Sequence, residues 1–73
     1  MLAKIMSGRQ DANIAFADLC NAVSRLGFTL TIRGSHHVFT REGFDLINLQ
    51  PVGHLAKSYQ VRQVRQTLKK GGI

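Results

Sequence analysis

Apolar residues recur at helical spacing in two separate stretches of the chain. In the first, between residues 14 and 26, one helical stripe collects Phe16, Leu19, Cys20 and Val23. Asp11 or Asn13 can cap the start of this helix, and Gly27 can end it. The second stretch begins at Ser58, a good N-cap residue, and carries an apolar stripe of Val61, Val64 and Leu68.

A basic stripe runs beside the apolar stripe of the second predicted helix. Arg62, Arg65 and Lys69 repeat there at the same spacing. Such a stripe is either a solvated helix face or a surface that contacts phosphate groups, and the sequence favours the two interpretations about equally.

The segment between the two predicted helices alternates apolar and polar residues, as strands do. Phe28, Leu30 and Ile32 share one face of a strand over residues 28–32. Gly34-Ser35 interrupts the alternation, and a second strand follows over residues 36–40. Residues 41–43 predict a turn and residues 44–50 a third strand, which Pro51 ends because proline has no N–H for the ladder.

These elements predict a small α+β domain with the order α-β-β-β-α. Short connections join neighbouring antiparallel strands, so the three strands should form an antiparallel sheet. Neither a helix nor a sheet can bury its apolar face alone, and both helices should therefore pack on one face of the sheet. We expect one domain over residues 11–73, preceded by a flexible tail over residues 1–10.

Charge and composition narrow the class of partner. The 73 residues carry ten Lys and Arg against four Asp and Glu, a net charge of +6, which favours an anionic partner. The plainer explanation is that the charge only keeps a small protein soluble. A single cysteine excludes an intramolecular disulfide, and no apolar run approaches the roughly 20 residues of a membrane span. We expect a cytoplasmic protein with no metal and no other cofactor.

Two histidines follow a glycine and a serine at the start of the second predicted strand. Imidazole both accepts and donates protons near neutral pH, so Gly34-Ser35-His36-His37 in a basic chain points to RNA chemistry. If Phe39 is a core residue, His37 shares its side of the strand and His36 faces outward. We favour His36 as the reactive residue and keep His37 as the alternative, while a merely exposed or structural histidine is the commoner case.

Residues around the histidines suit phosphate binding. Gly34 lets the backbone approach a phosphate, and the Ser35 hydroxyl can donate to a non-bridging oxygen, although the same pair also makes a plain hairpin turn. Arginine and lysine side chains nearby can stabilise charge that develops on the phosphate. With the basic stripe added, the expected RNA-binding residues are Arg33, Gly34, Ser35, Arg41, Lys57, Arg62 and Arg65.

Three further residues have plainer interpretations. His54 lies in the predicted loop and is either a second acid or base or, more commonly, a solvated side chain. Tyr59 is more often a core residue than a platform for stacking a base. Cys20 on the apolar stripe is expected to be a small core residue.

Several runs of residues resemble the HicA toxins. They are Leu26-Gly27-Phe28, the run from Arg33 to Phe39, Asn48-Leu49-Gln50-Pro51, the run from Ala56 to Arg65, and Gly72-Ile73. The likeness covers about residues 14 to 73, and its most specific part is the Gly-Ser-His-His element in so short a basic chain. The chain differs from the commoner family pattern in its short connection over residues 41–43 and in having Gln-Pro where many members have His-Pro.

The resemblance implies a double-stranded-RNA-binding-domain-like fold, metal-independent cleavage of mRNA, and inhibition by a cognate HicB-like antitoxin. The family's catalytic histidine corresponds most often to His36 and in some members to His37. The chain would then be the endoribonuclease toxin of a toxin–antitoxin pair. Two alternatives stay open, namely a noncatalytic RNA-binding module of the same fold and a protein whose sheet face or strand edge only docks another chain.

Overall fold

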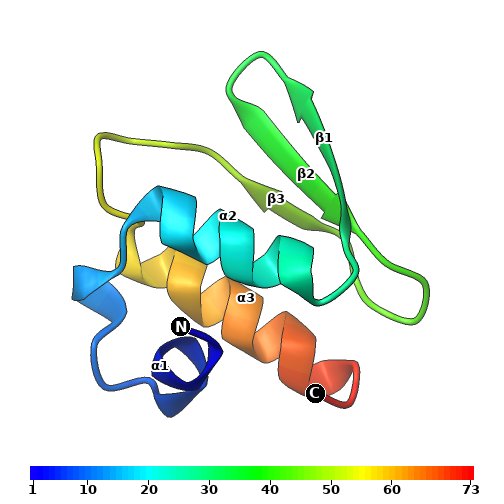
Figure 1. Ribbon diagram of the computed structural model, residues 1–73, viewed down its shortest axis with the longest axis horizontal. Coiled ribbons are helices and arrows are strands. Elements are labelled where there is room, and N and C mark those ends of the chain that lie inside the picture. The colour runs from blue at the N-terminus through cyan, green and yellow to red at the C-terminus, as the bar shows by residue number, and fades with distance from the viewer.

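Three strands lie between two long helices in the chain, and a short helix precedes them (Figure 1). The computed structural model describes residues 1–73. In chain order the elements are α1 Leu2–Ser7, the 3₁₀ helix η1 Asp11–Asn13, α2 Phe16–Arg25, β1 Thr29–Arg33, β2 His36–Thr40, β3 Ile47–Leu49 and α3 Ser58–Lys70. The predicted α+β class and the order α-β-β-β-α are confirmed.

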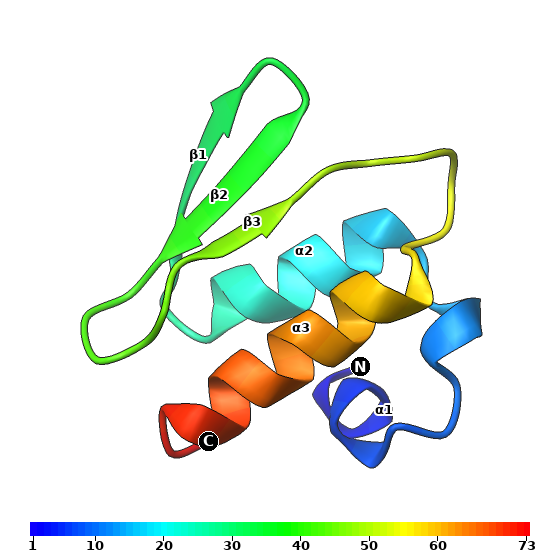
Figure 2. The ribbon, with the colours of Figure 1, turned by 180° about the vertical axis from the view of Figure 1, so that it is seen from behind.

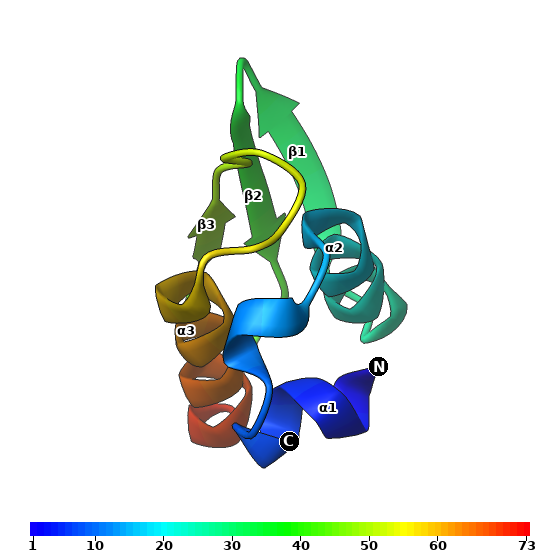
Figure 3. The same ribbon diagram turned by 90° about the vertical axis from the view of Figure 1, so that its left-hand side faces the viewer.

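The three strands form one antiparallel sheet in the order β1-β2-β3. The register pairs Leu30 of β1 with Phe39 of β2, and Phe39 with Ile47 of β3. Phe39, Ile47 and Leu49 have no exposed surface, so the face of the sheet that carries them is the buried face. Figure 3 shows α2 and α3 side by side on this face, and no helix on the other.

The core lies between this sheet face and the two long helices. The helix positions predicted from the apolar stripes supply it, and those with no exposed surface are Leu19, Val23, Val61, Val64 and Leu68. Burying one such side chain contributes about 1.5–3 kcal/mol. Seen from behind, α2 and α3 lie below the sheet, and the upper part of the β1–β2 hairpin extends beyond them (Figure 2).

Residues 1–10 do not form the flexible tail that we expected. Residues 2–7 form α1, which lies against α2 and α3 on the side away from the sheet (Figure 3). Ile5 is fully buried there, and Nη1 of Arg65 donates a hydrogen bond to its carbonyl oxygen at 3.1 Å. Partners about sixty residues away in the chain hold this segment, and for that reason its own short sequence pattern did not predict it.

The guanidinium of Arg65 also binds Asp11 at both carboxylate oxygens, at 2.9 and 3.1 Å. Both side chains are only 14% exposed. The hydrogen bond from Arg65 holds the pKa of the Asp11 carboxyl below its usual value, and the same bond raises the pKa of Arg65. This ion pair connects α3 to η1. The separate hydrogen bond from Arg65 to the Ile5 carbonyl oxygen connects α3 to α1.

The helix ends partly follow the prediction. Gly27 ends α2 with a φ of 88°, in the left-handed region that glycine favours. Asp11 and Asn13 lie in η1 and cap nothing, so that prediction is wrong. At α3 the N-cap is Lys57, one residue before the predicted Ser58.

The third strand is shorter than predicted, because Phe44 leaves it to pack elsewhere. The Phe44 ring lies edge-on to Phe28, with ring centroids 5.1 Å apart. The guanidinium of Arg41 lies over the same ring at 4.7 Å. Only Ile47–Leu49 pair as β3.

β1 is an exposed edge of the sheet. Leu30 and Ile32 share the side of Phe39 in the register, yet they are 37% and 56% exposed. As the edge strand, β1 is covered less than β2, and the tip of the β1–β2 hairpin projects beyond the helices (Figure 1). Elsewhere, the structure contains no helix with the length and apolar content needed to cross a membrane.

Gly71, just after α3, packs against the Phe44 ring, and this contact can be tested. A methyl group on Gly71 would overlap the ring carbons of Phe44, whereas the Gly71 backbone, with a φ of −83°, accepts alanine without strain. We expect Gly71→Ala to cost about 1–3 kcal/mol of unfolding free energy, measured by chemical denaturation. The loss should be smaller in a Phe44→Leu background; equal losses in both backgrounds would contradict this explanation.

The Asp11–Arg65 ion pair predicts a second stability effect. Asp11→Asn should cost roughly 1–3 kcal/mol at neutral pH, because Arg65 would stay mostly buried without its anion. The matched control is Asp45→Asn, since the Lys70–Asp45 pair is 75% and 63% exposed and its removal should cost less than about 1 kcal/mol.

The same ion pair should respond to acid. Because folding lowers the pKa of Asp11, its contribution is complete above about pH 4 and is lost as the pH falls through the lowered value. Thermal melting at neutral pH and near pH 3 should therefore show a smaller difference between wild type and Asp11→Asn in acid. A difference that does not change with pH would argue against the ion pair.

Candidate functional site

The histidine motif lies at the projecting tip of the β1–β2 hairpin. Arg33 pairs with His36, so Gly34 and Ser35 form a two-residue connection between the strands. Gly34 has a φ of 60° and Ser35 has a negative φ, the pattern of a type II′ hairpin turn. Gly34 and Ser35 therefore form the predicted hairpin turn, and both residues are exposed, as the approach of a phosphate to the backbone would require.

His36 is exposed on the open face of the sheet. Its Nδ1 atom lies 3.4 Å from the amide Oδ1 of Asn48 in β3. In the tautomer that donates from Nδ1 to this oxygen, Nε2 is the nitrogen that can accept a proton. Phe39 is buried and His36 faces outward, as the alternation along the strand predicted.

His37 occupies the opposite face and is half-buried. Its ring meets Phe16 of α2 edge-on, with centroids 5.1 Å apart and an interplanar angle of 85°. Its Nδ1 atom lies 3.1 Å from the carbonyl oxygen of Ser35, to which it must donate. These contacts fix the His37 ring beside the turn, whereas His36 has a single hydrogen-bond partner, Asn48.

Two glutamines that the sequence analysis did not single out support the turn. Gln50, just after β3, donates from Nε2 to the Ser35 hydroxyl oxygen at 2.8 Å. Gln60 of α3 donates to the Gln50 carbonyl oxygen at 2.8 Å and accepts from the Lys57 N–H at 3.1 Å. Gln60 lies four residues before Val64 on the apolar stripe, so a polar residue at a core position was the signal that could have revealed it.

Some of the expected RNA-binding residues lie at this end of the sheet. Arg33 is directly opposite His36 in the register and shares its face. The Lys57 backbone is connected to the turn through Gln60 and Gln50, whereas its side chain lines a hollow beside His54. Arg33 is therefore the cation that lies directly beside His36 at the tip.

Arg41 lies at the other end of β2. Five residues separate it from His36, about 16 Å along an extended strand. Its Nη1 atom donates to the Leu26 carbonyl oxygen at 2.8 Å, and its guanidinium stacks on Phe44. The structure therefore does not bring Arg41 to the histidines.

The basic stripe of α3 also points elsewhere. Arg65 is mostly buried and bound to Asp11, so it is not a free phosphate contact. Arg62 is exposed, and its charge helps to lower the pKa of the same Asp11, which places it beside the ion pair. For Arg65 the expectation of RNA contact is wrong because the guanidinium holds the fold together.

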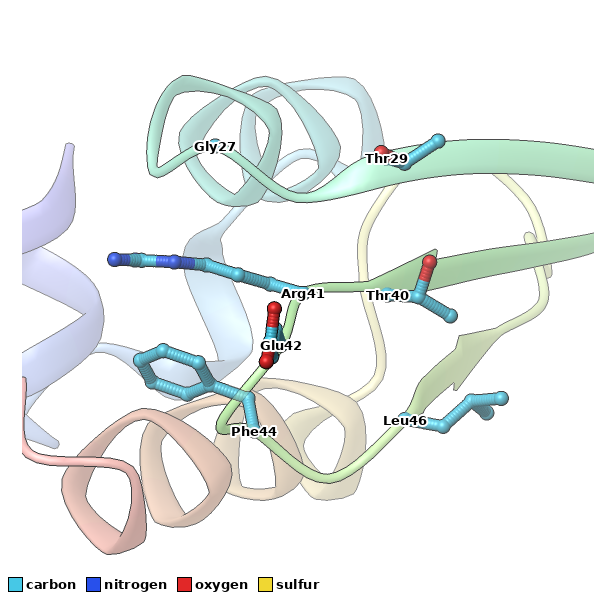
Figure 4. A pocket seen from close by; sticks show the side chains of 7 residues that line it. All are labelled: Gly27, Thr29, Thr40, Arg41, Glu42, Phe44 and Leu46. Atoms are coloured by element: carbon cyan, nitrogen blue, oxygen red, sulfur yellow. The ribbon is translucent and has the colours of Figure 1, made fainter.

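The two largest hollows lie away from His36 and His37. One, of about 490 Å³, is lined by residues that include Thr29, Thr40 and Arg41, at the far end of the open face (Figure 4). The other, of about 500 Å³, is lined by residues that include His54 and Lys57. The histidine tip is thus a projecting surface, suited to an extended substrate rather than to an enclosed small molecule.

The exposure of Cys20 and of Tyr59 tests the two predictions that each is a core residue. Burial raises the pKa of the Cys20 thiol to about 11, and the side chain is a core residue as predicted. Tyr59 is 57% exposed, so the expectation of a core tyrosine is wrong. Nowhere do three or more His, Cys, Asp or Glu side chains come together in the geometry of a metal site.

Comparisons with known proteins assign no family to the chain. No protein-family model, no curated protein and no solved structure matches it.

Proposed function

We propose that this chain is a cytoplasmic endoribonuclease of the HicA toxin type that cleaves mRNA without a metal ion. The observation that carries the proposal is the exposed His36 beside Arg33 and Ser35 on a projecting tip, in a chain of net charge +6. Positive charge gathers a polyanion, and an accessible imidazole can transfer protons at its phosphodiester bonds.

The proposed reaction uses the ribose 2′-hydroxyl as the nucleophile. Nε2 of His36 accepts the 2′-hydroxyl proton, the 2′-oxygen bonds to phosphorus, and the bond from phosphorus to the 5′-oxygen breaks. The 5′-oxygen takes a proton from water, and the products are a 2′,3′-cyclic phosphate and a 5′-hydroxyl. In the reverse assignment His36 protonates the leaving oxygen; a single histidine cannot perform both transfers at once, so turnover should be modest.

The residues around His36 have complementary tasks. The Arg33 side chain and the Lys57 ammonium hold the backbone phosphates, and Gly34 allows close approach of the chain. The Ser35 hydroxyl donates to a non-bridging oxygen of the phosphate under attack. Arg62 remains available only for phosphates farther along the RNA.

The proposed partner is a HicB-like antitoxin with an acidic surface. Carboxylates opposite Arg33 would neutralise the tip, and their bulk would deny RNA access to His36. Binding to the folded toxin alone would also raise its apparent stability by mass action.

Alanine substitutions test the catalytic assignment. His36→Ala should abolish cleavage of a defined RNA by the purified protein, with EDTA present throughout, while the melting temperature changes little because the side chain is exposed. His37→Ala should retain cleavage but melt at a lower temperature, since the ring packs on Phe16. Loss of activity only in His37→Ala would reverse the assignment, and RNA binding without cleavage by the wild type would favour the noncatalytic module.

Salt dependence tests the phosphate contacts. If Arg33 and Lys57 each neutralise one phosphate of single-stranded RNA, log affinity should fall with log salt at a slope of about −1.4, from roughly −0.7 per contact. Lys57→Gln should reduce the slope by about 0.7 without changing base preference. Lys69→Gln, on an exposed position of α3, is the control and should leave the slope unchanged. A flat response in the wild type would remove the electrostatic basis of the proposal.

A further inference from the structure

The Gln60 side chain is the one buried polar side chain of the molecule, and its orientation is determined by its partners. It is only 2% exposed. Its Oε1 atom accepts from the Lys57 N–H, which can only donate, and its Nε2 atom donates to the Gln50 carbonyl oxygen, which can only accept. Reversing the amide would break both bonds in a buried place, so Gln60 holds the backbone of Gln50 in one position.

Gln50 needs this support because it lies between the end of β3 and Pro51. No strand hydrogen bond holds its carbonyl, and the residue after it has no N–H. Fixed by Gln60, Gln50 extends its side chain to the turn and donates to the Ser35 hydroxyl oxygen at 2.8 Å. The core of the domain is in this way connected to the hairpin tip by two hydrogen bonds.

That bond restricts where the Ser35 hydroxyl hydrogen can point. A hydroxyl that accepts from Gln50 must direct its own hydrogen elsewhere, and no protein acceptor is bonded to it. Ser35 is exposed and adjacent to His36. We infer that Gln50 and Gln60 are positioning residues that aim the Ser35 hydroxyl hydrogen at a non-bridging oxygen of the phosphate at His36. The inference rests on the proposed ribonuclease function and adds two residues to its machinery.

The experiment compares kcat and KM of variants on one defined RNA. Ser35→Ala should lower kcat by about 100-fold, as loss of a donor to developing negative charge does. Gln50→Leu should lower kcat by about tenfold with KM and melting temperature almost unchanged, because the hydroxyl remains but is no longer aimed. Gln66→Leu, an exposed glutamine on the same helix as Gln60, is the control and should match the wild type.

A double variant separates positioning from a general structural effect. Gln50 acts only through Ser35, so Gln50→Leu should cause no further loss of kcat in a Ser35→Ala background. Gln50→Glu keeps the size of the side chain but can only accept at neutral pH; it should take the Ser35 hydrogen and lower kcat at least as much as Gln50→Leu.

The outcomes distinguish this inference from the function on which it rests. If the wild type cleaves RNA, His36→Ala does not, and Gln50→Leu has wild-type kcat, the positioning role is overturned and the ribonuclease stands. Independent, multiplying losses from Gln50→Leu and Ser35→Ala would overturn it as well. If the wild type shows no cleavage that depends on His36, both proposals fail together.

Discussion

Phe39 has no exposed surface, and its burial determines the orientation of every other residue in β2. Side chains alternate along a strand, and a slip of one residue would turn the whole set over. With Phe39 against the helices, His37 must lie on the inner side against Phe16, and His36 must face outward toward Asn48. The same hydrophobic contact that stabilises the domain therefore separates the two histidines into one that packs and one that is available for chemistry.

Gln60 shows how the small core also shapes the surface. A buried amide is costly unless its hydrogen bonds are made, and the two that Gln60 makes connect the start of α3 to the end of β3. From there the Gln50 side chain bonds to the turn before His36. A hydrophobic side chain in place of Gln60 would leave two backbone groups without partners. The stability of the domain and the order of the hairpin tip thus depend on the same residue.

The periodic parts of the sequence predicted the fold well. The apolar stripe that contains Val61 and Val64 and the alternation around Phe39 are local patterns, and all three residues are buried as those patterns predict. The helices, the strands and the outward orientation of His36 follow from such patterns. Features that depend on distant partners were missed. Ile5 is ordered by Arg65, and Arg65 in turn is withdrawn from the surface by Asp11, 54 residues away. No pattern within a short window contains such pairings.

The same limit applied to the candidate site. The motif itself was visible because Gly34-Ser35-His36-His37 is contiguous, and its placement at a turn followed from glycine's conformational freedom. The separation of Arg41 from the motif follows from the length of the intervening strand and was open to prediction. The support from Gln50 was not, since it depends on the register of β3 and on where α3 begins.

The free edge of β1 has a consequence for the behaviour of the protein in concentrated solution. Its five residues are all exposed, and unpaired backbone groups beside Leu30 and Ile32 form a template on which another strand can add. Between copies of this chain, the net charge of +6 opposes that pairing. Screening shortens the reach of this repulsion from about 10 Å at 0.1 M salt to about 3 Å at 1 M. Colloidal stability is therefore governed by ionic strength, and salt that releases bound RNA also weakens the barrier to self-association.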